Sequence, residues 1–245
     1  MVKKIATSLL LLSLCGPAFS GIDLGGMVGA AKDLTTAATL SDADVRKLSA
    51  DAAKQSDRKN KLAPADNPYA QRLDKLLKGM KTTGAPKLNI KVYLKNEVNA
   101  FAMADGTIRI YSGLMDAMTD EEIRYVVGHE IGHAALGHSK KALQTAFAAS
   151  GVRQAAASSG NQKAANLSDS ALGDLAEKLV NAQFSQSQEH EADQYAVKFM
   201  KQNKYDPRAA VSALRKLEKM YGNDRSAFSS HPAPGERAQA VEKNI

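Results

Sequence analysis

The chain has 245 residues, of which 44% are hydrophobic and 24% are charged, and its formal net charge is +7. This composition excludes an intrinsically disordered chain and a protein with several membrane spans. The length allows one large domain, or one domain with an appendage.

The N-terminus is typical of a secretory signal peptide. Two lysines precede the apolar run 5–14, which is too short to span a bilayer. Ala18 and Ser20 are the small residues expected just before a cleavage site. We therefore expect residues 1–20 to be removed, which lowers the formal charge to +5 because they carry two lysines and no acidic residue. A periplasmic location follows.

Cys15 is the only cysteine, and it lies within the predicted signal. The mature chain would therefore hold neither a disulfide nor a cysteine-bound metal. Bacterial lipoproteins are acylated on a cysteine at the end of such a signal, which would anchor the protein to a membrane. Leu14 stands where those signals have a small residue. We expect a soluble form, with lipidation as the alternative.

Residues 21–64 predict a leader followed by one helix. The leader, 21–40, begins with several glycines and has little periodic hydrophobicity. Ser41 is a favourable N-cap with Asp44 three residues later, so a helix should begin there. We expect the main domain to span residues 65–245.

The main domain begins with a helix and a small sheet. Residues 69–80 have apolar side chains at the i, i+3, i+4 and i+7 positions of a helix. Apolar and polar residues then alternate over 88–111, on both sides of the turn signal Asp105-Gly106. We expect a small antiparallel or mixed sheet, the turn favouring antiparallel pairing.

Three helices and one loop follow. Thr119 and Glu122 form a capping box that should start a helix running to about residue 136. The stretch around 150–168 is rich in Ala, Ser and Gly, which predicts a loop and a candidate lid or partner surface. A long helix is expected over 169–200.

The residue pair Asp206-Pro207 predicts the start of a last long helix, which should run through Tyr221. The fold class is therefore α+β, mostly helical with one small sheet, and the helix after Thr119 carries the chemistry.

His129-Glu130-Ile131-Gly132-His133 is an H-E-x-x-H motif. At about 100° per residue, the two histidines lie on one face of a helix and can reach one metal ion. Neutral imidazoles suit Zn²⁺, and Glu130 can take a proton from water. The alternative is a chance pair of surface histidines, but the motif lies inside a capped helix, as the mechanism requires.

A catalytic zinc site takes a third protein ligand and keeps one open position. Without cysteines, a carboxylate on a second helix is the natural candidate, and Glu189 offers one. Asp193 follows one helical turn later and could hold a ligating imidazole in one tautomer. Taken alone, this pair would be a solvated acidic face.

Three histidines remain. His190 lies about 100° around the helix from Glu189, so we expect it at the surface. His138 lies about 180° from His129 by the same rotation and should mark the helix end with Gly137. His231 is followed by Pro232 and could stabilise an oxyanion near the metal. The alternative for His231 is an ordinary loop histidine.

The motifs together resemble the HtpX-like zinc metallopeptidases. The likeness rests on H-E-x-G-H at 129–133, E-x-x-A-D at 189–193, H-P-x-x-x-x-R at 231–237 and Asn-Ala-Phe-Ala at 99–102, and it covers about residues 40–245. It implies a zincin-type domain holding one zinc ion. In some relatives the loop histidine is linked to a self-inhibited state. The implied roles are ligation by His129, His133 and Glu189, general base catalysis by Glu130, support or proton delivery by Asp193, and action near the zinc by His231.

The resemblance implies a cell-envelope endopeptidase that acts on unfolded or misassembled envelope proteins. Members close to this chain are typically outer-membrane lipoproteins, from which Leu14 departs. An extended substrate could pair with the strand around 99–103, although Phe101 is equally compatible with the core. The main alternative is a non-catalytic envelope chaperone with a zinc site. A nucleic-acid binder is not expected, because the mature charge is small and the chain has no Trp.

Overall fold

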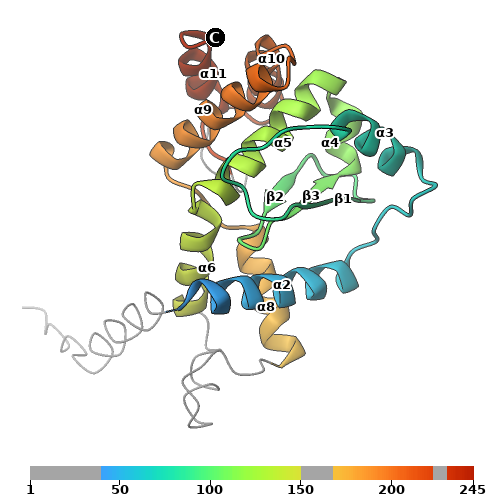
Figure 1. Ribbon diagram of the computed structural model, residues 1–245, viewed down its shortest axis with the longest axis vertical. Helices are drawn as coiled ribbons and strands as arrows, with labels where there is room; N and C mark the ends of the chain where they lie inside the picture. The colour runs from blue at the N-terminus through green and yellow to red at the C-terminus, as the bar shows by residue number, and fades with distance from the viewer. Residues whose placement is uncertain (1–39, 150–167, 223–230) are drawn as a thin grey trace, which may run out of the picture.

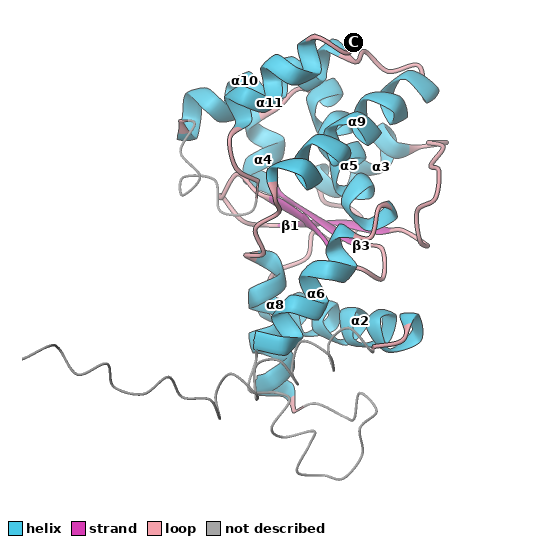
Figure 2. Ribbon diagram, turned by 90° about the vertical axis from the view of Figure 1, so that its left-hand side faces the viewer, coloured by secondary structure: helices cyan, strands magenta, loops and turns pink. Residues whose placement is uncertain are grey.

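A three-stranded sheet lies between two layers of helices (Figure 1, Figure 2). The computed structural model describes residues 40–149, 168–222 and 231–245. The predicted signal peptide, the leader up to residue 39 and most of the predicted loop at 150–168 lie outside these residues. Within the described part of the chain, no helix is both long and apolar enough to cross a bilayer.

The described elements confirm a mostly helical fold with one small sheet. The helices and strands are α2 (Asp42–Lys59), α3 (Pro68–Leu77), β1 (Asn89–Tyr93), β2 (Ala100–Ala102), β3 (Thr107–Tyr111), α4 (Ser112–Ala117), α5 (Asp120–Ala135), α6 (His138–Ala149), α8 (Asp169–Val180), α9 (Gln186–Gln202), α10 (Arg208–Tyr221) and α11 (Pro234–Glu242).

The sheet is mixed, with strand order β1-β3-β2. β2 and β3 pair antiparallel across the turn at Gly106, which has a φ of 92°. β1 pairs with β3 in parallel, because the chain between β1 and β2 crosses to the far side of β3. The prediction of antiparallel pairing is therefore confirmed for β2 and wrong for β1, since both strands pair with β3. β2 forms an edge of the sheet.

Alternating side chains divide the sheet between two hydrophobic cores. Val92, Ala100 and Ile110 face the layer that contains α5, α9 and α10. Their neighbours Tyr93 and Phe101 face the opposite layer, formed by α2, α6 and α8. The period-2 alternation of a strand accounts for this division. Phe101 is thus a core residue.

α2 is fixed to the sheet by a partly buried ion pair. Arg109 on β3 donates from Nε and Nη2 to the two carboxylate oxygens of Asp57, each at 2.8 Å. The Tyr93 hydroxyl donates to the same carboxylate at 2.6 Å. Burial raises the pKa of Asp57, but these hydrogen bonds outweigh it and the pKa lies below its usual range. The helix therefore belongs to the folded unit.

The expected helix over 169–200 is two helices, α8 and α9, which is a correction. The chain leaves helical geometry after Val180, and α9 starts at a capping box in which Ser185 and Gln188 satisfy each other's backbone groups. The S-x-x-Q pattern is the local signal for this start.

The C-terminal end of the chain holds two differences from the sequence-based expectation. α10 was expected to be the last helix, but α11 follows it, with Pro234 at its first position. The N-cap of α10 is Pro207 rather than Asp206, although the Asp206 side chain accepts a hydrogen bond from the Arg208 backbone at 3.0 Å.

Candidate metal centre

The helix α5, which holds the H-E-x-x-H motif, begins at the predicted capping box. Thr119 donates its backbone N–H to the Glu122 carboxylate at 2.8 Å, and its side chain accepts from the Glu122 backbone. The same carboxylate accepts from Lys216 and Ser212, each at 2.7 Å, which ties α10 to the start of α5. The helix therefore starts at a fixed place, so its histidines face a fixed direction.

Two glycines allow α9 to approach α5 closely. Gly128 and Gly132 lie one helical turn apart on the face of α5 that packs against α9. A Cβ atom on Gly128 would lie 2.6 Å from a ring carbon of Phe199, and one on Gly132 would lie 3.2 Å from the backbone of Ala192. This close packing brings the acidic residues at the start of α9 to the histidines of α5.

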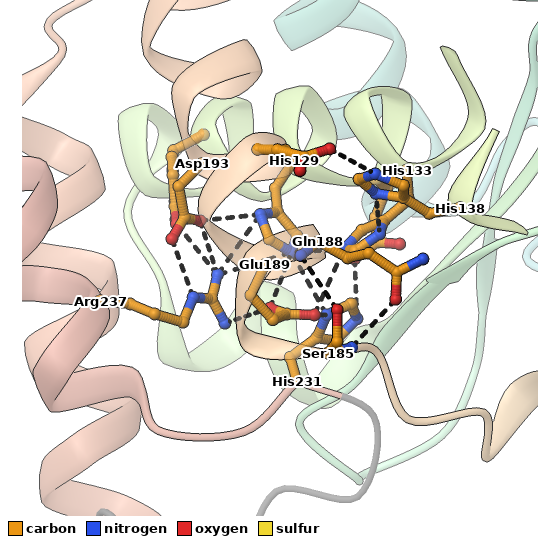
Figure 3. Close-up of polar contacts among 12 residues, drawn as sticks. His129, His133, His138, Ser185, Gln188, Glu189, Asp193, His231 and Arg237 are labelled. Atoms are coloured by element: carbon orange, nitrogen blue, oxygen red, sulfur yellow. Dashed lines mark hydrogen bonds and ion pairs between the residues drawn. The ribbon is translucent and has the colours of Figure 1, made fainter. Parts of the chain in front are cut away.

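Four side chains converge between these helices (Figure 3). The Nε2 atoms of His129 and His133 are 3.0 Å apart, and Nδ1 of His231 lies 3.2 Å from Nε2 of His129. Oε1 of Glu189 lies 3.4 Å from Nε2 of His133. One ligand atom from each residue lies within 4.8 Å of the other three, and all four side chains are buried.

The donor set fits a zinc ion. Imidazole nitrogens and one carboxylate are the ligands that Zn²⁺ takes in catalytic sites. Burial lowers the pKa of His133 to about 3, so its ring is neutral and keeps a lone pair. Three ring nitrogens that face one another at this spacing cannot all be satisfied by one another. A cation between them satisfies them together.

Asp193 contacts the nitrogen of His129 that faces away from the donor cluster. Its Oδ1 lies 2.9 Å from His129 Nδ1 and accepts from the Tyr125 hydroxyl at 2.7 Å. Arg237 donates from Nε to Asp193 Oδ2 at 2.8 Å, and its Nη1 lies 2.6 Å from Glu189 Oε2. Burial raises the pKa of Asp193, but Arg237 outweighs it and holds that pKa well below its usual range. The carboxylate is therefore ionised and fixed.

Glu130 lies beside the donor cluster. Its Oε1 lies 3.3 Å from His231 Nε2, whereas its Oε2 is buried and has no hydrogen-bond partner among the described residues. A buried carboxylate oxygen without a partner is costly unless it has a ligand or a water to receive. Glu130 therefore presents a carboxylate oxygen that can accept a hydrogen bond or a proton beside the donor cluster.

His231 lies closer to the donor cluster than the sequence indicated. Its Nδ1 is 3.0 Å from Glu189 Oε1, so it can serve as a fourth ligand as well as an oxyanion partner. Burial lowers its pKa, but the carboxylates of Glu189 and Glu130 raise it to about 10. The two carboxylates therefore favour the protonated ring, whereas ligation of a metal ion requires the neutral ring.

The expectation for His138 is wrong. The helix does end near Gly137, which has a φ of 76°, but the chain then turns and His138 begins α6. Its ring is buried, and its Nδ1 lies 3.1 Å from Nδ1 of His133. The angular position of His138 along one ideal helix could not predict this contact, because the helix ends near Gly137. His190 is exposed, as predicted.

Phe184 is a site residue that the sequence did not single out. It lies between α8 and α9, and its ring stacks on His133 with the ring centroids 3.8 Å apart. It also stacks on His231 at 5.5 Å. The only available signal was its place just before the capping box at Ser185.

The two converging helices, the histidine pair and the single carboxylate define a zincin-type metallopeptidase. Residues 65–245 match the model of peptidase family M48, and the chain belongs to this family of zinc metalloendopeptidases.

Two relatives named as metalloproteases are similar over nearly their whole length. The chain is 47% identical to metalloprotease LoiP of Escherichia coli strain K12, over 91% of this chain and 89% of LoiP. It is 40% identical to metalloprotease YcaL of the same strain, over 100% of this chain and 96% of YcaL. A mitochondrial metalloendopeptidase OMA1 of Arabidopsis thaliana is 29% identical, over 62% of this chain and 30% of OMA1.

Proposed function

We propose that this metallopeptidase is an endopeptidase of the bacterial cell envelope that cleaves unfolded or misassembled proteins. The observation that carries the catalytic part is the buried Oε2 of Glu130, which has no hydrogen-bond partner among the described residues and lies beside a donor set suited to zinc. Export through a signal peptide at 1–20 supports the periplasmic location, with outer-membrane association as an addition. Nucleic acid is not a proposed partner.

His129, His133 and Glu189 would hold the zinc ion. When bound, zinc polarises a carbonyl and lowers the pKa of a coordinated water to about 7. Glu130 takes the proton of the attacking water and returns it to the leaving amine. A protonated His231 donates a hydrogen bond to the oxyanion that forms on the scissile carbonyl. Asp193 keeps His129 in the tautomer that leaves Nε2 unprotonated.

The edge strand β2 supports an extended substrate. Ala100 on β2 lines the same small cavity as His129, Glu130 and His231. A peptide that adds to this edge gains main-chain hydrogen bonds whatever its side chains are. Unfolded segments expose such backbone, and folded proteins do not, so the proposed substrates are unfolded proteins.

The test is Glu130→Gln in the full chain, with casein as an unfolded substrate. We expect cleavage to fall by at least about 10²-fold, the size of a general base contribution, while the zinc content stays near one per chain. Glu177→Gln on the exposed face of α8 is the matched control and should cleave normally. Normal cleavage by Glu130→Gln refutes its role as the base. A wild type that cleaves no unfolded protein favours the chaperone alternative.

A further inference from the structure

The nitrogen of His133 that faces away from the donor cluster has its own partners. Its Nε2 points toward Glu189 and the other histidines, and its Nδ1 lies 3.1 Å from Nδ1 of His138 (Figure 3). The second nitrogen of His138, Nε2, lies 3.1 Å from Oε2 of Glu191. We infer that His138 is a positioning residue for His133 and that Glu191 sets the tautomers of both rings.

The direction of the hydrogen bonds follows from the chemistry of imidazole. A neutral ring carries one N–H and one lone pair, and an ionised carboxylate only accepts. Glu191 therefore takes the N–H of His138 Nε2, which leaves a lone pair on His138 Nδ1. That lone pair accepts the N–H of His133 Nδ1. The lone pair of His133 then lies on Nε2, where a metal ion requires it.

The reverse arrangement opposes metal binding at one end and is unfavourable at the other. It would put the N–H of His133 on Nε2, where a metal ion needs the lone pair. It would also set the lone pair of His138 Nε2 against the carboxylate oxygen of Glu191. Because His138 is buried, neither ring can turn to water for a replacement partner.

α9 thus orients both histidines of α5. Asp193 contacts Nδ1 of His129 directly at 2.9 Å, inside the protein. Glu191 acts on His133 through the ring of His138, from a side chain that is 53% exposed. Ser187, one turn earlier on α9, donates to Glu191 Oε1 at 3.0 Å and holds that carboxylate in place.

This inference rests on the proposed role of His133 as a metal ligand, but its test does not require cleavage. The metal-free full chain, labelled with ¹⁵N in histidine, is studied by two-bond ¹H–¹⁵N correlation spectroscopy, which reports the tautomer of each ring. We expect His133 to carry its proton on Nδ1. In His138→Leu the proton should move to Nε2 in a large fraction of molecules. His138→Asn, whose side-chain oxygen can accept near the same place, should restore most of the wild-type tautomer.

Zinc affinity, measured by competition with a chelator, is the second readout. Loss of such a supporting partner lowers metal affinity about 10–100-fold, which we expect for His138→Leu. Glu191→Gln should lower affinity severalfold, and because Glu191 is exposed this variant should fold even if a change at His138 does not. His190→Leu removes an exposed histidine from the same helix and should change neither readout.

An unchanged His133 tautomer and unchanged zinc affinity in both His138→Leu and Glu191→Gln would overturn the inference. Equal loss in the Leu and Asn variants, without a change of tautomer, would also overturn it, because it indicates a packing role. Casein cleavage distinguishes this positioning role from the proposed endopeptidase function. A chain that behaves as expected here but never cleaves casein keeps the positioning role and loses the endopeptidase function.

Discussion

The packing of Gly132 against α9 makes the metal site sensitive to one methyl group. In Gly132→Ala, the new Cβ would lie 3.1 Å from Cβ of Tyr195 and 3.2 Å from Cα and O of Ala192. Carbon atoms prefer separations of about 3.5–4.0 Å, so α9 must move away by roughly 0.4 Å. Ala192 lies between Glu189 and Asp193 on the same helix, so both carboxylates move with it.

The size of the effect can be worked out from this displacement. Overpacking costs about 1–3 kcal/mol, and alanine regains about 0.5–1 kcal/mol of helix stability over glycine. The central values of these ranges give a net loss of about 1 kcal/mol in the free energy of unfolding, within a range of about 0–2.5 kcal/mol. A zinc site tolerates errors of about 0.2 Å in its ligand distances. A shift of about twice that should weaken zinc binding on the order of tenfold, which corresponds to about 1.4 kcal/mol.

The assay combines urea unfolding of the metal-free protein with chelator competition for zinc. Gly79→Ala is the matched control, because Gly79 has a φ of 74° and no atom lies within 4 Å of the position of its Cβ. A left-handed alanine there should cost about 1 kcal/mol without touching α9. We expect both variants to lose stability and only Gly132→Ala to lose zinc affinity. If both bind zinc like the wild type, the spacing of the two helices does not set the ligand geometry.

Two further changes test features outside the ligand set. Phe184→Ala removes the ring that stacks on His133, so a chelator should extract zinc several times faster. Stopped-flow with a metal indicator measures this rate. An unchanged rate would show that the ring does not cover the site. Asp57→Asn leaves the Arg109 charge buried without its counter-ion and should cost on the order of 2 kcal/mol in urea unfolding at pH 7. The pKa of folded Asp57 lies below the ordinary value of 3.8, so its carboxylate stabilises the fold above pH 3.8. The difference in unfolding free energy between wild type and variant should therefore shrink as the pH falls through the folded pKa. A difference that stays constant down to pH 2 would contradict this account.

Local signals predicted the start of the active-site helix. The capping box at Thr119 and Glu122 involves residues three positions apart, so the sequence contains all that it needs. The same pattern at Ser185 and Gln188 was available, but the apolar residues on both sides of it suggested one continuous helix. The helix–helix contact at Gly132 could not be predicted, because it depends on which residue of α9 faces it.

The surroundings of His133 show where prediction along the chain fails. The angular position of His138 was extrapolated past Gly137, whose positive φ ends the helix and redirects the chain. Phe184 was not predicted as a site residue, because the continuous helix expected over 169–200 places it among the apolar packing residues. Both side chains reach His133 only through tertiary structure, whereas Asp193 was predictable because it is one helical turn from Glu189 on α9.

The match to the peptidase family starts at residue 65, after the end of α2, yet the second hydrophobic core depends on that helix. A truncated protein that begins at residue 65 would keep every side chain of the metal centre. It would also expose the aromatic face of the sheet to water and leave the Arg109 guanidinium without its counter-charge. Expression of the catalytic portion should therefore begin before Ser41, because the folded unit is larger than the region that the family model matches.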